Sequence, residues 1–162
     1  MIKVWLRSWN LKTIRLRKEV VRCNECKKTK EFFYLSDFAY GQRLVFFKDS
    51  TQMAFVNFIE DKVYNQYIDI VNKVIGEAKS NEEIMEFVQA SFGITCDKIN
   101  NHKVDFLCGQ KKCLFCGSDK FERNMIEPES FVNMEVSEIT HKTWEKLSEE
   151  QKVFEVKKID FY

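Results

Sequence analysis

Paired cysteines are the residues of this chain whose type and spacing could do chemistry. The chain has six cysteines, and four of them form the C-x-x-C pairs Cys23–Cys26 and Cys113–Cys116. Two residues between thiolates allow a tight turn to aim both sulfurs at one ion, and N–H groups of the turn can hydrogen-bond those sulfurs. Two such turns together close a tetrahedral shell of four thiolates. The pattern therefore predicts a structural Zn²⁺ site, since catalytic zinc keeps a coordination position for water.

Two other interpretations of these cysteines stay open at this point. The pairs could be redox-active, although neither opens an amphipathic helix in a βαβ unit, where a helix N-terminus lowers a thiol pKa. They could also be unliganded thiols. Of the remaining cysteines, Cys108 precedes Cys113 closely enough to replace one of the ligands. Cys96 follows an apolar stretch and is expected to be a small core residue.

The second pair continues as Cys113-Leu-Phe-Cys116-Gly117, the form expected of a zinc knuckle, in which glycine takes a positive φ. The first pair is followed by Lys27 instead. With these two pairs the sequence resembles the zinc-ribbon class of four-cysteine proteins, in which each knuckle sits at the tip of a β-hairpin. The resemblance covers residues 18–32 and 106–124 and implies Zn²⁺ ligands at Cys23, Cys26, Cys113 and Cys116. Residues 27–112, 86 positions, separate the pairs and imply an inserted segment.

Hydrophobic periodicity places these turns in an α+β fold. Alternating patterns predict strands over 2–7, 11–22, 31–35, 43–47, 53–58, 120–126 and 131–139. Asp49 and Ser50 favour a turn over 48–51. A helical stripe runs over 60–78, and a second helix runs from the Ser80/Glu83 capping box to a stop at Gly93. Thr140 is expected to cap a short helix with Trp144 and Leu147, and residues 153–161 are ambiguous between strand and helix.

We therefore expect an antiparallel sheet with two zinc-knuckle hairpins and a helical pair inserted between them. The whole chain, 1–162, is expected to form a single domain. Its zinc-binding core comes from 18–32 and 106–124, its inserted hairpin and helical segment from 36–100, and its C-terminal strand and helix segment from 127–162.

Charge is unevenly distributed along the chain. The net charge is +1, but the first thirty residues carry ten basic and two acidic side chains. This segment could follow a phosphate backbone, or it could pair with the acidic C-terminal segment in one sheet. The near-zero total favours internal pairing, because a dedicated nucleic-acid binder more often keeps a positive field. The basic residues concerned are Lys12, Arg15, Arg17, Lys18, Arg22, Lys27, Lys28 and Lys30.

Residues for catalysis are hard to find in this sequence. The two histidines, His102 and His141, have no partner at metal or triad spacing and are expected at the surface. None of the glycine-rich phosphate-binding motifs, metalloprotease motifs or nucleophile-elbow motifs occurs. The chain is therefore predicted not to be an enzyme, with a site assembled from scattered residues as the alternative.

These observations favour a cytoplasmic zinc-binding protein that acts by protein–protein interaction, in the style of an inhibitor or toxin-immunity protein. A secretory signal and an apolar run of membrane-spanning length are both missing from the sequence, so neither secretion nor a membrane partner is expected. Fifteen Phe, five Tyr and three Trp supply core rings or interface anchors. The first alternative is a nucleic-acid-binding zinc-ribbon protein of the transcription or RNA machinery, and the second is an enzyme.

Overall fold

The computed structural model describes residues 10–36, 40–48 and 50–160. The strand expected over 2–7 and Asp49 of the expected turn lie outside these residues. The described chain is α+β, as expected. Its strands are β1 (Leu11–Arg22), β2 (Thr29–Leu35), β3 (Gln42–Phe46), β4 (Met53–Asn57) and β5 (Ser130–Glu138). Its helices are α1 (Lys62–Ile75), α2 (Asn81–Ser91), the 3₁₀ helix η1 (Phe92–Thr95), α3 (Lys142–Glu145) and α4 (Glu149–Lys157).

The five strands form one mixed sheet in the order β2-β1-β5-β4-β3. Strand β1 lies antiparallel to both β2 and β5, and β3 lies antiparallel to β4. Strands β4 and β5 are parallel, with Ala54 opposite Ser137 and Phe55 opposite Glu138. The expectation of a purely antiparallel sheet was therefore wrong. Edge strands β2 and β3 approach each other, so the sheet curls toward a barrel.

Each face of the β3–β4 hairpin belongs to a different hydrophobic core, and side chains therefore alternate between two clusters. Val45, Ala54 and Val56 point into a core shared with the helices. Leu44 and Phe55 point into the interior of the curled sheet, where they join Leu16 and Val136. Burial on both faces explains why the first four residues of β4 are all buried.

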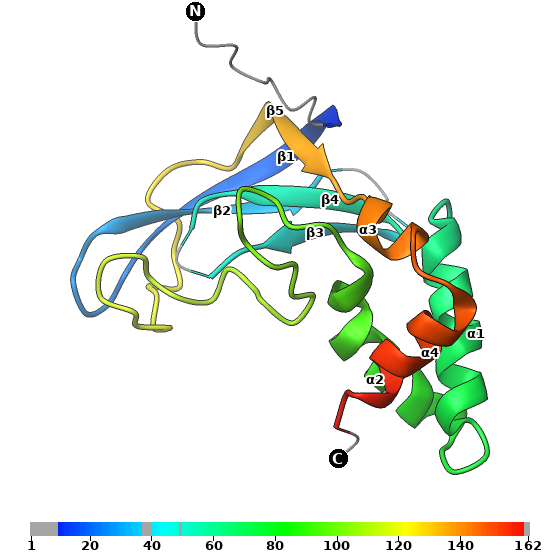
Figure 1. Ribbon diagram of the computed structural model, residues 1–162. Helices are drawn as coiled ribbons and strands as arrows, with labels where there is room; N and C mark the ends of the chain where they lie inside the picture. Colours follow the sequence, from blue (N-terminus) through cyan, green and yellow to red (C-terminus); the bar gives the residue numbers. More distant parts are fainter. Residues whose placement is uncertain (1–9, 37–39, 49, 161–162) are drawn as a thin grey trace, which may run out of the picture.

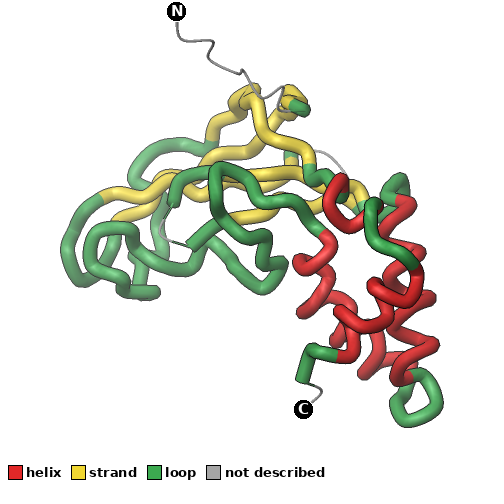
Figure 2. Tube along the Cα trace, viewed as in Figure 1, coloured by secondary structure: helices red, strands yellow, loops and turns green. Residues whose placement is uncertain are grey.

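The helices form one end of the molecule, and Figure 2 shows them gathered away from the cysteine-bearing loops. Asp61 caps α1 by accepting hydrogen bonds from Val63 N–H and Tyr64 N–H. Ser80 and Glu83 form the expected capping box of α2. Residues 153–157 of the ambiguous tail belong to helix α4, which begins with a capping box of Ser148 and Gln151, and residue 161 lies outside the described residues. No helix in the described part of the chain has the length and apolar composition needed to cross a bilayer.

Two local expectations were wrong in this region. Gly93 does not stop α2, because it lies inside η1, two residues beyond the end of that helix. Thr140 does not cap α3: the cap position is His141, whose side chain makes no capping hydrogen bond. The N–H groups of Lys142 and Thr143 donate instead to the distant carboxylate of Asp97, at 2.7 and 3.0 Å. The Thr140 hydroxyl supports that carboxylate with a hydrogen bond of 2.7 Å.

The two cysteine pairs lie at the end opposite the helices (Figure 1). The first pair occupies the tip of the β1–β2 hairpin, as expected. The second lies in a long loop between η1 and β5, so a second knuckle hairpin is not formed. The strand expected over 120–126 is reduced to a single bridge between Cys23 and Phe121, with backbone hydrogen bonds from Glu122 to Arg22 and from Ile126 to Val20.

Candidate metal centre

The first C-x-x-C pair forms a tight turn closed by its own backbone. Cys23 N–H donates to Lys28 C=O at 2.9 Å, and Lys27 N–H donates back to Cys23 C=O at 3.1 Å. The turn requires a left-handed backbone conformation at Lys27, whose φ is +61°. Glycine would accept this φ without strain, whereas lysine adopts it at a cost.

The second pair repeats the same arrangement of bonds. Cys113 N–H donates to Ser118 C=O at 2.7 Å, and Gly117 N–H donates to Cys113 C=O at 2.9 Å. The left-handed position is filled here by Gly117, with φ of +74°. Both turns are therefore knuckles of one type, although only the first is carried by a hairpin.

The two knuckles face each other across 86 positions of sequence and bring their sulfurs together. Cys23 Sγ lies 3.6 Å from Cys116 Sγ, and Cys26 Sγ lies 3.6 Å from Cys113 Sγ. All four sulfurs lie within 4.8 Å of one another and could hold a metal ion. A tetrahedron with metal–sulfur bonds of about 2.3 Å has edges of about 3.8 Å, so the spacing suits four thiolates around one ion. Disulfides need about 2.05 Å between sulfurs, which is much shorter than these separations.

Hydrogen bonds from the turns favour thiolates at this cluster. The N–H groups of Phe115 and Cys116 lower the pKa of Cys113 to about 6. The backbone at Cys26 likewise lowers the pKa of Cys23. Cys116 behaves differently: although Ser118 N–H lowers its pKa, burial and the neighbouring thiols outweigh this and raise its pKa to about 11. A cation in place of the thiol protons would relieve the competition between Cys113 and Cys116.

Neither of the other cysteines belongs to the cluster. Cys108 lines a cavity beside the second knuckle, and it is not one of the four residues whose sulfurs converge. Cys96 packs against the helical core, and burial raises the pKa of its thiol to about 12. Its expected place as a small core residue is confirmed.

The loop that carries the second knuckle is tied to both edges of the curled sheet. On the β2 side, the Gln110 amide forms two hydrogen bonds of 2.7 Å with the N–H and C=O of Phe33, in the manner of a neighbouring strand. Lys30 Nζ donates to the C=O groups of Gln110 and Lys112. On the β3 side, Arg43 donates to Phe106 C=O at 2.6 Å. The loop thus spans the gap between β2 and β3, and its far end is fixed at Cys113.

Four of the eight basic residues named above, Lys12, Arg17, Lys18 and Lys27, pair with acidic side chains. Lys12 pairs with Glu138 at 3.8 Å, and Arg17 pairs with Glu129 at 3.5 Å, both in the C-terminal segment. Two further ion pairs are Lys18–Glu31 and Lys27–Glu122. Lys30 is half-buried among carbonyl groups. Arg15, Arg22, Lys28 and Lys30 are the members of the set for which the described residues provide no ion pair.

Sequence reasoning missed a buried polar cluster around His141. The expectation of a surface histidine was wrong, because only 8% of His141 is exposed; His102 is exposed, as expected. His141 Nε2 lies 2.8 Å from Asp61 Oδ2, and Nδ1 lies 3.0 Å from both Thr95 C=O and Thr95 Oγ1. The partners stand 80 and 46 positions away in sequence, so no local pattern connects them.

Both nitrogens of His141 face groups that accept hydrogen bonds. The Thr95 hydroxyl donates to Phe92 C=O at 2.9 Å, so towards His141 it offers an oxygen lone pair. The surroundings therefore favour the doubly protonated ring. Burial by itself lowers the pKa of His141, but the hydrogen bond and charge of Asp61 outweigh it, and the pKa is raised. The ring borders a second cavity of about 350 Å³ with Glu60, Glu138 and Glu145. Asp61 and Thr95 thus lie within hydrogen-bonding distance of both ring nitrogens.

Comparison with known proteins returned no similarity: neither a protein-family model, nor a curated protein, nor a solved structure matches the chain.

Proposed function

We propose that this chain is a non-enzymatic zinc-binding protein of the cytoplasm that acts by binding a partner protein. The observation that carries the proposal is the convergence of four thiolates, which fills a tetrahedral shell and leaves the ion no position for water or substrate. Four thiolates in a tetrahedral arrangement are a set that suits Zn²⁺. A reducing compartment suits such a site, since it keeps paired cysteines available as thiolates. The ion then has a structural role, and function lies in the surface that it fixes.

That surface is the second knuckle and the loop before it. Leu107, Leu114 and Phe115 are 69%, 45% and 62% exposed, although their apolar side chains would normally be buried. Lys28 lies over the Phe115 ring, with Nζ 4.1 Å from the ring centre. Exposed apolar residues with a lysine beside them suit a partner with an apolar patch and an acidic border. An inhibitor or toxin-neutralising protein is the class proposed, by analogy with small proteins that work through one such surface.

The metal can be tested with a matched pair of substitutions. Cys116→Ser removes a sulfur from the cluster, whereas Cys108→Ser makes the same chemical change outside it. Elemental analysis of purified protein is expected to find one zinc per chain in the wild type and in Cys108→Ser, and a clear loss in Cys116→Ser. Zinc loss in Cys108→Ser would assign that residue as a ligand and contradict the proposed set.

The docking surface can be tested with a second matched pair. Phe115→Ser removes an exposed ring at the knuckle, and Phe154→Ser removes an equally exposed ring on α4. Zinc-loaded wild type is immobilised and used to retain proteins from native lysate at moderate salt. A partner that binds through the second knuckle should be retained by the wild type and by Phe154→Ser, and it should be lost from Phe115→Ser. An inhibitor role further requires that stoichiometric addition of this chain reduces the activity of the retained protein. Retention of the same proteins by the wild type and by both variants would contradict the assignment of the second knuckle as the docking surface.

A second candidate function, nucleic-acid binding, is favoured by one observation on the outer face of the sheet. Arg15 lies over the Phe131 ring at 4.7 Å, and Arg17 lies over the Tyr34 ring at 4.9 Å, from neighbouring strands. Exposed rings beside guanidinium groups are a surface on which bases stack. The test is binding of single-stranded RNA at about 50 and about 200 mM salt, where phosphate contacts predict a steep loss of affinity. Arg15→Glu is expected to abolish this binding, while Lys146→Glu, a charge reversal near α3, leaves it unchanged.

A further inference from the structure

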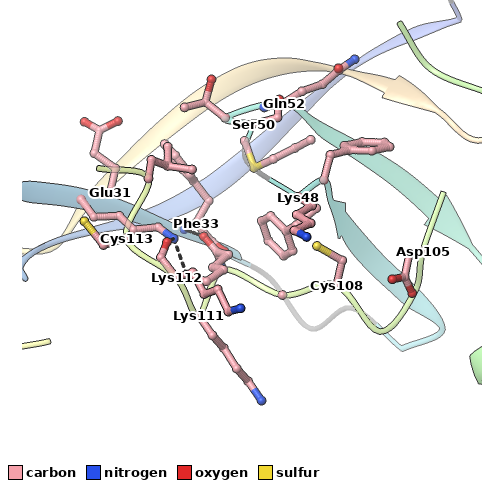
Figure 3. A pocket seen from close by; sticks show the side chains of 18 of the residues that line it. Glu31, Phe33, Lys48, Ser50, Gln52, Asp105, Cys108, Lys111, Lys112 and Cys113 are labelled. Atoms are coloured by element: carbon pink, nitrogen blue, oxygen red, sulfur yellow. Dashed lines mark hydrogen bonds between the residues drawn. The ribbon is translucent and has the colours of Figure 1, made fainter. Parts of the chain in front are cut away.

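A cavity of about 550 Å³ lies where the loop over residues 105–115 spans the two edges of the sheet. Figure 3 shows it between β2, the β3–β4 turn and that loop. Its walls come from segments far apart in sequence, and they are held together by Gln110, Arg43 and the second knuckle. The volume lies within the range of about 300–1,000 Å³ that small-molecule sites occupy.

The inner wall of this cavity is apolar. Phe33, Phe46 and Met53 line it and also belong to the hydrophobic cluster inside the curled sheet. Phe47 and Leu107 add to the apolar lining. A ligand that enters here would therefore place an apolar body against aromatic rings and methylene groups, which is favourable in proportion to the area removed from water.

The rim of the cavity is positively charged. Lys30, Lys48, Lys111 and Lys112 line it, against the carboxylates of Glu31 and Asp105. Lys30 is committed to backbone carbonyl groups, whereas Lys48, Lys111 and Lys112 are exposed and form no ion pair with another described residue. Three lysines that line an apolar cavity and form no described ion pair make it complementary to an anion with an apolar tail.

We propose that this cavity binds a small anionic amphiphile, with its apolar body inside the sheet and its carboxylate or phosphate at the lysine rim. The cavity shares Leu107, Leu114 and Phe115 with the docking surface described above, but binding of the amphiphile requires no protein partner. A peptide is less well accommodated, because extended peptides bind sheet edges by adding a strand, and Gln110 already occupies both backbone groups of Phe33 on the β2 edge.

Cys108 provides a readout inside the site. Its sulfur points into the cavity in Figure 3, and in the zinc-loaded protein the four clustered cysteines are held as ligands while Cys96 is packed in the core. Iodoacetamide should therefore modify Cys108 first. The zinc-loaded chain is titrated with decanoate, decyl phosphate, 1-decanol and decyltrimethylammonium, and the alkylation rate of Cys108 is followed by mass spectrometry. The two anions distinguish a carboxylate from a phosphate ligand.

Both anions, or one of them, are expected to protect Cys108 with an affinity at least about tenfold tighter than the cation of equal length. Lys48→Glu is expected to weaken that protection about tenfold, whereas Lys146→Glu, with the same change in net charge, leaves it unchanged. Cys108→Phe places a ring in the cavity and should abolish binding measured by calorimetry, with zinc content as the check that the variant is folded.

Three outcomes would overturn the proposal. Equal protection by decanol and the anions would show that the rim does not select charge. Binding without protection of Cys108, or binding that survives both Lys48→Glu and Cys108→Phe, would place the ligand elsewhere. Protection by an acidic peptide and by none of the amphiphiles would replace a small-molecule ligand with a protein segment.

Discussion

At the scale of single residues, the two knuckles differ most at the position after the second cysteine. Lys27 and Gly117 both adopt a left-handed backbone, with φ of +61° and +74°. This conformation costs a residue with a Cβ about 1–2 kcal/mol relative to glycine. Glycine keeps only part of that advantage, because it loses more backbone entropy than other residues when the chain folds. The two turns are therefore equivalent in hydrogen bonding and unequal in strain.

Exchanging the residue types at these positions should shift stability in opposite directions. We expect Lys27→Gly to raise the free energy of unfolding by about 0.5 kcal/mol and Gly117→Ala to lower it by about 1 kcal/mol. A Cβ at Gly117 meets no atom within 4 Å, so the second change reports backbone strain without a clash. Urea unfolding of the metal-loaded variants measures both. Equal effects of one sign would contradict the shared turn geometry.

His141 gives a second prediction at this scale, through the pH dependence of stability. Its pKa is raised in the folded protein, so its stabilising contribution is complete below the unfolded pKa of about 6.5 and is lost as pH rises through the folded value. Asp61, whose carboxylate binds His141, has a lowered pKa; burial opposes this shift and the histidine outweighs it. The Asp61 contribution is therefore lost only as pH falls below about 3.8 toward its folded pKa.

His141→Gln is expected to lower the free energy of unfolding by about 1–3 kcal/mol near pH 6 and by less near pH 9. Wild type should lose stability between pH 6.5 and the folded pKa with a slope of up to about 1.4 kcal/mol per pH unit, and the variant should lack that component. Guanidinium unfolding of both proteins across this window measures the difference. A stability difference that grows with pH would contradict a charged His141.

At the scale of elements, local sequence predicts what local interactions determine. The capping boxes and apolar stripes of α1 and α2 are contained within single segments, and both helices lie where the pattern placed them. Alternation in Ile14–Arg17 correctly indicates β1, since side chains of a strand point alternately to its two faces. The first knuckle was predicted on its hairpin because β1, the turn and β2 are contiguous.

Interactions between distant segments explain the expectations that were wrong. Strands β4 and β5 are parallel. Helices α1 and α2 and the second knuckle lie between them in sequence, and a connection of that length can return the chain in either direction, so the strand pattern alone does not predict the orientation. Residues 120–126 extend along β1 with too few backbone bonds to form a strand. Asp97 caps α3 from 45 positions away. The spacing within each cysteine pair predicts a turn, whereas the meeting of the two turns depends on all of this topology.

The 3₁₀ helix η1, which follows α2, packs closely against the backbone at Val104. A Cβ built on Gly93 would lie 2.2 Å from the C=O of Val104, which is backbone and cannot rotate away. We expect Gly93→Ala to lower the free energy of unfolding by about 2 kcal/mol or more, because η1 must separate from residue 104. Gly109→Ala is the control, since its Cβ would meet only the Lys111 side chain at 3.7 Å. Thermal unfolding should leave this control within about 0.5 kcal/mol of wild type. Similar losses in both variants would contradict the close approach.

At the scale of the whole molecule, the helical core and the cysteine knuckles occupy opposite ends. Phe92 is the centre of the helical core, with ring centres of Tyr64, Tyr67, Phe106 and His141 at 5.0, 5.6, 5.5 and 5.4 Å. At the opposite end, the cysteine knuckles are joined to the sheet by a few side-chain and backbone hydrogen bonds and by the contact of Phe32 with Phe121. Leu107, Leu114 and Phe115 are exposed at that end, so an ion bound by four thiolates would supply much of its stability.

Removing the metal should therefore affect the two ends unequally. After chelation we expect a marked fall in the thermal midpoint, since metal binding is coupled to folding of residues 22–29 and 107–124. Hydrogen exchange should accelerate at those segments by orders of magnitude and change little in α1 and α2, whose core contains none of the four cysteines. Zinc added back to the chelated protein should restore both the midpoint and the exchange protection. An unchanged midpoint would contradict a structural metal. Uniform acceleration of hydrogen exchange along the chain would show that the two ends of the molecule unfold as one cooperative unit.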